Sequence, residues 1–416
     1  MKRLLPLLMF AVLAACSGAS RRVAAPPTGM LAGIDVLEAD AFKQLRGMRV
    51  GLITNQTGKN RVGRTTIEVL AHAPGVELVA LFMPEHGLQG TTETGQVSSG
   101  TVTLEDGRTL PLINSLYSPQ LARSPTPDLL EQVKLDAVVF DIQDIGARFY
   151  TYSASMAIAM EAAAKAGVKF VVLDRPNPIT GSIVEGPLLD PSVKHITAYF
   201  AIPVRHGLTM GEIARLHNRY KDVGVDLTVV PLRGWRRDRW YDETGLPWTR
   251  PSPNMPDVDA ASLYPGIGIF ESANLSVGRG TPVPFRWVGA PWLDAAAVVA
   301  RVQGQVDGVE FSVQDYTPTK LTKRDYMGEY CRGVRITVTD RSVMRPLAVF
   351  RHLALALREV HPKEFAFRWD ETKRMVGDDE FRRLWDTGAG MDAFVALFDK
   401  GPQDFEKVRR EILLYP

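Results

Sequence analysis

The chain has 416 residues, of which 45% are hydrophobic, and it carries a formal charge of +2. This length and apolar content are enough to bury a large core, and the length favours two domains. The small charge argues against an electrostatic nucleic-acid binder, which requires a clear basic excess.

The first residues have the pattern of an export signal. Lys2 and Arg3 precede an apolar run at 4–13 that is too short to span a bilayer. The run ends in Leu13-Ala14-Ala15-Cys16, which resembles a bacterial lipobox. We therefore expect a lipoprotein signal peptide at 1–15 and lipidation of Cys16. An ordinary secretory signal with a chance cysteine is the alternative.

The residues after Cys16 predict a tethered, exported protein. Ser17 in this position resembles Gram-negative lipoproteins of the outer membrane, so we expect a periplasmic protein anchored there by lipid. The composition of 16–28 is typical of a flexible tether. Without Lys2 and Arg3 the mature chain is neutral (+2 − 2 = 0). If Cys16 carries lipid, Cys331 has no partner, and we expect no internal disulfide.

Strands and helices alternate through the first half of the chain. Helices are expected at Thr65–Ala71, at Ser153–Ala166 and, after a capping box at Thr209–Glu212, through Tyr220. Apolar, β-branched runs predict strands at Arg49–Thr54, Glu77–Met83, Ala137–Ile142, Lys169–Leu173 and Asp226–Val230. This alternation predicts an α/β fold, a Rossmann-like doubly wound parallel sheet, in the N-terminal domain.

The second half has a different texture. A segment rich in proline and tryptophan at 235–256 is interpreted as an ordered loop, and we place the domain boundary just after it. The expected domains are a Rossmann-like catalytic domain at 29–258 and a smaller α+β C-terminal domain at 259–416 that closes the cleft. Within the latter we expect a strand at Arg335–Thr339 and helices at Pro346–Val360 and Asp392–Leu414.

Three polar clusters follow predicted strands of the N-terminal domain. They are Pro84-Glu85-His86-Gly87, the run 141–150 and Asp174-Arg175-Pro176-Asn177-Pro178. The carboxyl ends of parallel strands open into one crevice where ligands bind. We therefore expect these carboxylates and guanidiniums to face a common cleft. Such a set suits a polyhydroxylated, anionic substrate.

Glu85 is the sharpest catalytic candidate. Glycoside hydrolysis requires a carboxylic acid that protonates the leaving oxygen, and Glu85 lies in a constrained loop at a strand end. His86 is an alternative acid or base. The competing interpretation is that Glu85 only bonds loop amides.

The second cluster has two aspartates, Asp141 and Asp144. Their spacing does not supply the ordered oxygen ligands of a hard-cation site, and no zinc spacing is present, so we expect no metal. A structural alternative is that Asp141 caps the following turns and Asp144 pairs with Arg148. Arg175 either binds a substrate carboxylate through two N–H groups of its guanidinium or pairs with Asp141 or Asp174.

The second half offers further candidates. Glu271 is the best second carboxylate, and Arg279, in a glycine-rich loop, is another anion clamp. Five of the seven tryptophans lie between 235 and 292, where they either stack on sugar rings or pack in the core. The chain has no G-x-G-x-x-G, no G-x-x-x-x-G-K-[ST] and no G-x-S-x-G pattern, so we expect no nucleotide cofactor.

Several long motifs together resemble the exo-β-N-acetylmuramidase (NamZ) family. They are GLITNQTG at 51–58, PEHG at 84–87, FDIQDIGARFY at 140–150, DRPNP at 174–178, VEGP at 184–187, PSPNMP at 251–256 and SVGRGT at 276–281. The resemblance covers nearly the whole mature chain. It implies a Rossmann-like domain, a smaller C-terminal domain with a cleft between them, and release of N-acetylmuramic acid from the non-reducing end of peptidoglycan glycans.

The resemblance also implies that Glu85 is the catalytic carboxyl. The full catalytic set that we assign is Glu85, His86, Asp141, Asp144 and Glu271. The resemblance gives the substrate a lactyl carboxylate, and we expect it to be bound by Arg148, Arg175 or Arg279. The expected substrate-binding residues are Asn55, Arg148, Tyr150, Asp174, Arg175, Asn177, Glu185, His206, Asn254 and Arg279.

We expect peptidoglycan fragments and a membrane, through the lipid on Cys16, as partners. Two rival functions remain open at this point. One is a non-catalytic lipoprotein that binds cell-wall glycans, and the other is a hydrolase of another bond, such as an amidase.

Overall fold

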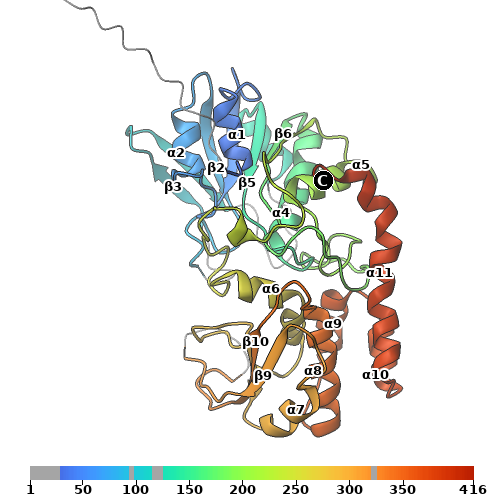
Figure 1. The fold of residues 1–416 in the computed structure, drawn as a ribbon. Helices are drawn as coiled ribbons and strands as arrows, with labels where there is room; N and C mark the ends of the chain where they lie inside the picture. Colours follow the sequence, from blue (N-terminus) through green and yellow to red (C-terminus); the bar gives the residue numbers. More distant parts are fainter. Residues whose placement is uncertain (1–28, 93–97, 115–124, 320–325) are drawn as a thin grey trace, which may run out of the picture.

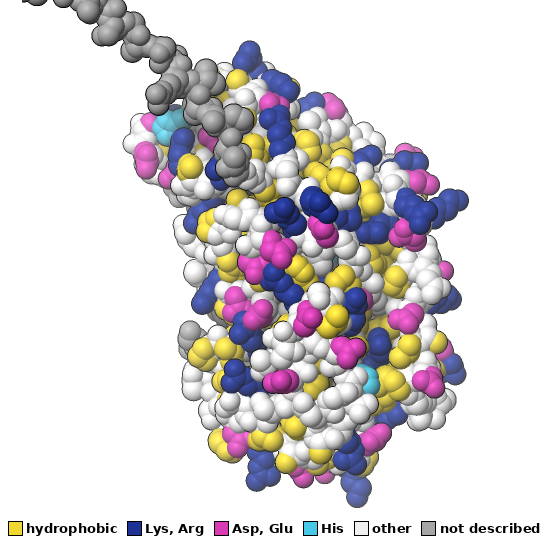
Figure 2. Space-filling view, in the orientation of Figure 1, with side chains coloured by type: hydrophobic (Ala, Val, Ile, Leu, Met, Phe, Trp, Pro, Cys, Tyr) yellow, Lys and Arg dark blue, Asp and Glu magenta, His cyan; other side chains and the backbone are white. Residues whose placement is uncertain are grey.

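The computed structural model describes residues 29–92, 98–114, 125–319 and 326–416 (Figure 1). The predictions for the signal peptide, Cys16 and the tether fall outside these residues. Figure 1 shows a large sheet flanked by helices in the upper part and a smaller sheet with its own helices below. Figure 2 shows acidic and basic side chains interspersed over this face.

The larger sheet has seven strands in the order β3-β4-β2-β1-β5-β6-β7. All neighbouring pairs are parallel except β3–β4, which is antiparallel and forms one edge. The six parallel strands, counted along the chain, have the order 3-2-1-4-5-6 of a doubly wound Rossmann sheet. The strands are β1 (Arg49–Thr54), β2 (Glu77–Met83), β3 (Gly100–Thr103), β4 (Thr109–Asn114), β5 (Ala137–Asp141), β6 (Lys169–Leu173) and β7 (Leu227–Val230).

Helices cover both faces of this sheet because its strands are apolar on both sides. Leu52 and Val139 point into one core, which also contains residues of α1 (Gly33–Ala39) and α2 (Thr66–Ala71). Ile53 and Phe140, the next residues along, point into the other core. That second core contains residues of α3 (Pro127–Val133), α4 (Thr151–Ala166) and α5 (Met210–Tyr220). Successive side chains of a strand face opposite sides, so each strand supplies both cores.

The C-terminal region is built around an antiparallel sheet with the order β8-β10-β9. Its residues join the second core of the larger sheet, so one continuous apolar cluster connects the two parts. The strands are β8 (Trp287–Ala290), β9 (Val309–Val313) and β10 (Arg332–Val338). The helices are η1 (Tyr241–Glu243) in the preceding loop, then α6 (Val258–Ile267), η2 (Gly268–Ser272), α7 (Ala295–Val302), α8 (Pro346–Val360), α9 (Trp369–Val376), α10 (Glu380–Asp386) and α11 (Met391–Ile412).

The last helix returns the chain to the N-terminal domain. Figure 1 shows α11 running along one side of the molecule, from α10 up to α5. Arg215 of α5 donates to the carbonyls of Ile412 and Leu413 at 3.0 and 3.1 Å. Beyond the helix, the hydroxyl of Tyr415 donates to Asp174 at 2.5 Å and accepts from the backbone N–H of Leu232 at 3.0 Å. The C-terminal tail is thus part of the carboxyl edge of the large sheet.

The predicted fold class is confirmed, and most elements agree with their predicted bounds. β1, β2, β6 and α8 have the predicted ends, whereas α4 begins at Thr151, two residues before its predicted start, and β10 covers 332–338 instead of 335–339. The hairpin β3–β4 was not predicted, because β3 is a short, mostly exposed edge strand and β4 is interrupted by Pro111. None of the described helices combines the length and apolarity needed to cross a membrane.

The tail network predicts a large stability effect from one hydroxyl group. We expect Tyr415→Phe to lower the free energy of unfolding by about 1–3 kcal/mol, because it leaves the buried N–H of Leu232 without its partner and removes one hydrogen bond from the buried Asp174 carboxylate. Urea unfolding measures this change. Tyr330→Phe is the matched control, since Tyr330 is 61% exposed and its hydroxyl donates to the exposed Asp315. Equal, negligible effects of the two substitutions would show that the tail bond is not stabilising.

Candidate active site

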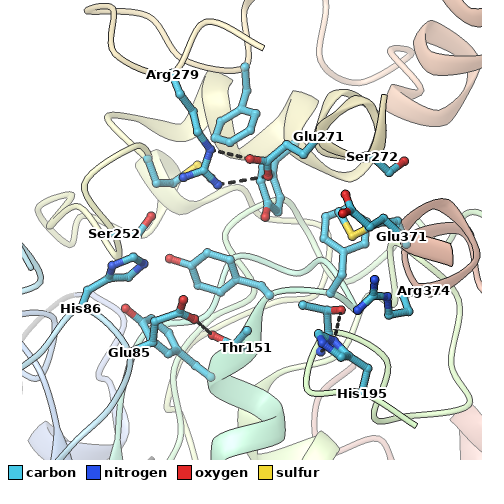
Figure 3. Close-up of a pocket in the computed structure, with 18 residues that line it drawn as sticks. Glu85, His86, Thr151, His195, Ser252, Glu271, Ser272, Arg279, Glu371 and Arg374 are labelled. Carbon is cyan, nitrogen blue, oxygen red and sulfur yellow. Dashed lines mark hydrogen bonds and ion pairs between the residues drawn. The ribbon is translucent and has the colours of Figure 1, made fainter. Parts of the chain in front are cut away.

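A cavity of about 310 Å³ lies between the carboxyl edge of the large sheet and the C-terminal region (Figure 3). Both parts of the chain supply its walls. The N-terminal domain contributes Glu85, His86, Phe149, Tyr150, Thr151, Tyr152, His195, Thr197, Ser252 and Met255. The C-terminal region contributes Tyr264, Glu271, Ser272, Arg279, Phe285, Glu371, Arg374 and Met375.

Glu85 enters the cavity from a tight turn at the end of β2. His86 and Gly87 have φ angles of +70° and +74°, and the N–H of Gly87 donates to the carbonyl of Pro84 at 3.0 Å. The left-handed conformation of His86 is uncommon for a residue with a side chain. The hydroxyl of Thr151, the first residue of α4, donates to Glu85 Oε2 at 2.5 Å. The turn and this bond aim the carboxyl group into the cavity.

One ring nitrogen of His86 forms a hydrogen bond within the same loop. Its Nδ1 lies 2.9 Å from the carbonyl oxygen of Thr92. A carbonyl oxygen only accepts, so Nδ1 carries the hydrogen of this bond. In the neutral ring Nε2 is then the basic nitrogen, next to Glu85 in the cavity wall.

Glu271 and Arg279 form an ion pair on the opposite wall. Arg279 Nη2 donates to Glu271 Oε2 at 3.0 Å, and Nε lies 2.5 Å from Oε1 (Figure 3). The guanidinium also lies over the ring of Phe285, 5.3 Å from its centroid. Burial alone would lower the pKa of Arg279, but the charge of Glu271 outweighs it and raises that pKa. These two predicted residues therefore do lie in one cavity with Glu85.

The aromatic wall consists of tyrosines and phenylalanines. Tyr264 packs edge-on against Phe285 and Tyr150, with ring centroids 4.6 and 6.0 Å apart, and Tyr150 packs edge-on against Tyr152 at 5.0 Å. Among the described residues, no tryptophan lines this cavity. The sugar-stacking interpretation of the tryptophans is therefore corrected: Trp235, for example, packs against Tyr415, and Trp292 against His361.

Asp141 and Arg175 do not line the cavity, contrary to the expected common cleft. Both are buried below the turn that follows β1, and Arg175 Nε lies 2.5 Å from Asp141 Oδ1 while Nη2 lies 2.9 Å from Oδ2. The hydroxyl of Thr66 donates to the same carboxylate. The pairing of Arg175 with Asp141, one of the alternatives above, is what the structure shows. A guanidinium bound in this way has no fork free for a substrate carboxylate.

Arg148 is likewise withdrawn from the cavity. Its two terminal nitrogens donate to four carbonyl oxygens, those of Pro187, Ile202, Met375 and Val376, at 2.7–2.9 Å. Burial lowers the pKa of the guanidinium to about 9, so it stays protonated at neutral pH. The bonds to Met375 and Val376 join the N-terminal domain to α9. Arg148 therefore connects the two parts of the chain and does not pair with Asp144.

Asp174 and Asn177 are also held inside the protein. Asp174 accepts hydrogen bonds from the hydroxyls of Thr209 and Tyr415 and from the N–H of Gly211. Asn177 donates to the carbonyl of Leu208 at 2.9 Å. Neither side chain lines the cavity, because the loop after β6 is covered by α5 and by the C-terminal tail.

The other predicted residues lie behind the cavity walls. Asp144 accepts from the N–H of Gly146 at 2.8 Å, and its carboxylate lies 3.8 Å from Nε2 of His206. Glu185 pairs with the buried Arg205 at 2.9 Å, and burial raises the pKa of its carboxyl group. The remaining two are Asn55, whose Oδ1 accepts from the N–H and hydroxyl of Thr57, and the buried Asn254.

Sequence reasoning missed several lining residues. Thr151 directly follows the motif that ends at Tyr150, so its position next to that motif was a usable signal. His195, Glu371 and Arg374 belong to no motif that we recognised, and only the packing of α9 and the 191–200 loop brings them to the cavity. Within the described ranges, no group of three or more His, Cys, Asp or Glu residues is arranged to hold a metal ion.

The buried carboxyl of Asp174 predicts a specific pH dependence of stability. Burial raises its pKa to about 6 from 3.8, mainly through the loss of water. The folded state then binds the proton more tightly, so this stabilisation is complete below about pH 4 and is lost as the pH rises through 6. We expect wild type to lose roughly 3 kcal/mol of unfolding free energy relative to Asp174→Asn between pH 4 and pH 7.

Chemical unfolding of both proteins at several pH values measures this difference. Comparison with the asparagine variant removes the contributions of other titrating groups, which both proteins share. Stability curves that stay parallel from pH 4 to pH 7 would contradict the raised pKa.

Comparison with known proteins agrees with the geometry. Family profiles described as "Exo-beta-N-acetylmuramidase NamZ" match residues 50–259 (N-terminal) and 262–415 (C-terminal). The peptidoglycan β-N-acetylmuramidase NamZ of Bacillus subtilis is 37% identical over 413 residues, which are 98% of this chain and 97% of that protein.

Two crystal structures of DUF1343 family proteins from Bacteroides fragilis have the same fold. One has a TM-score of 0.84 at 32% identity and covers 94% of this chain and 100% of that one. The other has a TM-score of 0.72 at 28% identity and covers 93% and 99%. The chain belongs to the exo-β-N-acetylmuramidase NamZ family of glycoside hydrolases.

Proposed function

We propose that the protein releases N-acetylmuramic acid from the non-reducing end of peptidoglycan fragments such as MurNAc-GlcNAc, with Glu85 as the general acid. The observation that carries this proposal is the position of Glu85. Of the carboxylates predicted from the polar strand ends of the N-terminal domain, it is the one that lines the cavity. The others are engaged in buried ion pairs and hydrogen bonds.

The reaction needs a proton at the glycosidic oxygen. In the proposed step Glu85 donates its proton to the leaving oxygen as the bond to the anomeric carbon breaks, and water supplies the hydroxyl that ends on that carbon. Thr151 positions the carboxyl group, and the His86 ring lies beside it (Figure 3). Glu271 is the candidate for a second catalytic group, because it is a predicted carboxylate on the facing wall.

The size of the cavity supports exo-action on a single terminal sugar. Its volume of about 310 Å³ is near the lower end of ligand pockets, which are roughly 300–1,000 Å³. A long glycan that passes through the site would need an open groove. The tyrosine and phenylalanine rings provide apolar surface for the sugar, and the mixed polar groups suit its hydroxyls.

We expect Glu85→Gln to lower kcat by about 10²–10⁴-fold, because glutamine cannot donate a proton to the glycosidic oxygen. Release of N-acetylmuramic acid from MurNAc-GlcNAc measures the rate, because this sugar leaving group, unlike 4-nitrophenolate, has to be protonated as it departs. Glu77→Gln is the matched control: it is the same substitution at the exposed, opposite end of β2. Full activity of Glu85→Gln would show that Glu85 is not the general acid. Binding of MurNAc-GlcNAc by wild type without turnover would favour a glycan-binding lipoprotein instead.

We also propose that the protein works at the periplasmic face of the outer membrane, anchored by lipid on Cys16. The lipobox-like sequence 13–16 supports this location. We expect the full chain, expressed in a Gram-negative host, to partition into the detergent phase of Triton X-114, and Cys16→Ala to partition into the aqueous phase. Equal partitioning of the two proteins would contradict the anchor.

A further inference from the structure

An anionic sugar in this cavity requires a cation that the protein itself does not neutralise. Three carboxylates line the cavity, those of Glu85, Glu271 and Glu371, against the two guanidiniums of Arg279 and Arg374. The lactyl group of muramic acid adds a further negative charge. At least one guanidinium has to be available for it, since a partly buried carboxylate without a counter-charge is costly.

The arginines predicted for this task are already engaged. Arg148 donates to four backbone carbonyls and Arg175 is paired with Asp141, both outside the cavity. Arg279 does line the cavity, but Nε and Nη2 of its guanidinium are both bound to the carboxylate of Glu271. Binding a substrate carboxylate at Arg279 would require Glu271 to give up this pair.

Arg374 differs from these arginines. It lies in the last turn of α9, half-buried, and its Nε donates to the carbonyl of Asp370 at 3.0 Å. Among the described residues, no carboxylate forms an ion pair with it, and its terminal nitrogens keep their donors. The acidic neighbour Glu371 pairs with Arg368 at 3.1 Å. Arg374 therefore brings an uncompensated charge to the cavity wall.

The residues next to Arg374 supply a polar side chain and an apolar side chain that could contact a lactyl group. Figure 3 shows Arg374 beside His195 on one side of the pocket, with Glu85 and His86 on the other. His195 Nδ1 lies 2.8 Å from the hydroxyl of Thr197, and burial together with the charge of Arg374 lowers the pKa of His195. The ring is then neutral at pH 7. Met375, the next residue, also lines the cavity and offers apolar surface for the lactyl methyl group.

We propose that Arg374 binds the lactyl carboxylate of the terminal sugar and thereby selects N-acetylmuramic acid over sugars that lack this group. The proposal rests on the proposed function, because it assumes that a muramyl residue occupies the cavity. Arg374 is a specificity residue in this scheme and takes no part in proton transfer. The guanidinium offers two parallel N–H donors, the geometry that a carboxylate accepts.

The test compares two chromogenic substrates that differ only at the lactyl group. One is 4-nitrophenyl β-N-acetylmuraminide, and the other is the same glycoside with its lactyl carboxylate converted to the amide. For wild type we expect kcat/KM to favour the acid by roughly 100-fold, the lower range for loss of one partner of a desolvated charge pair. Arg374→Gln should lose this preference, with kcat/KM for the amide within about threefold of wild type and the loss for the acid mainly in KM.

Three further variants separate the explanations. Arg374→Lys keeps the charge without the fork, so its preference should be intermediate, and it covers the case in which Arg374→Gln does not fold. Arg382→Gln, on the exposed surface near α9, is the control and should keep the full preference. Arg279→Gln tests the other cavity arginine. The proposal is overturned if that variant, and not Arg374→Gln, abolishes the preference for the acid.

Failure of the inference and failure of the proposed function give different results. If wild type cleaves the acid substrate and both Arg374 variants keep the preference of wild type, Arg374 does not read the carboxylate. If wild type cleaves neither glycoside, the proposed function fails, and with it the premise of the inference. Inhibition by the free sugars gives an independent readout: Ki for N-acetylmuramic acid should rise in Arg374→Gln, whereas Ki for N-acetylglucosamine should stay nearly unchanged.

Discussion

Charged side chains that are taken out of water need an internal counter-charge or a full set of hydrogen bonds, and this requirement organises the carboxyl edge of the large sheet. The strand ends carry an unusual density of aspartate, glutamate and arginine. Most of them satisfy one another: Asp141 with Arg175, Glu185 with Arg205, and Asp174 with hydroxyls and amides. Glu85 and Arg374, in contrast, line the cavity.

The same requirement explains which parts of the site could be predicted from sequence. Apolar runs determine strands locally, so β1, β2 and β6 were placed correctly, and the glutamate at the end of β2 followed from them. Whether an arginine near a strand end is free or paired depends on a partner far away in the chain. Arg148 bonds residues 375 and 376, a separation of more than two hundred residues that no local pattern reveals.

The cavity depends on how the two parts of the chain are joined. Arg148 reaches from the loop after β5 to α9, and the bonds of its guanidinium end next to Met375 in the cavity wall. On the other side Gln56, in the turn after β1, donates to the carbonyl of Arg250, and Tyr152 donates to that of Pro251, so that the loop leading into the C-terminal region is held against the rest of the N-terminal domain. Polar contacts of this kind fix the orientation of the segments that they join. They hold Glu85 and Glu271 on facing walls of one pocket.

Two residues that follow α11 have a consequence for how fast the first domain can fold. Leu414 and Tyr415 complete hydrogen bonds to Glu212 and Asp174, which lie 202 and 241 positions earlier in the chain. Contacts between residues so far apart form slowly, because the intervening chain must first be closed into a loop. The polar network of the Rossmann-like sheet is therefore completed only when the C-terminal region has docked on it.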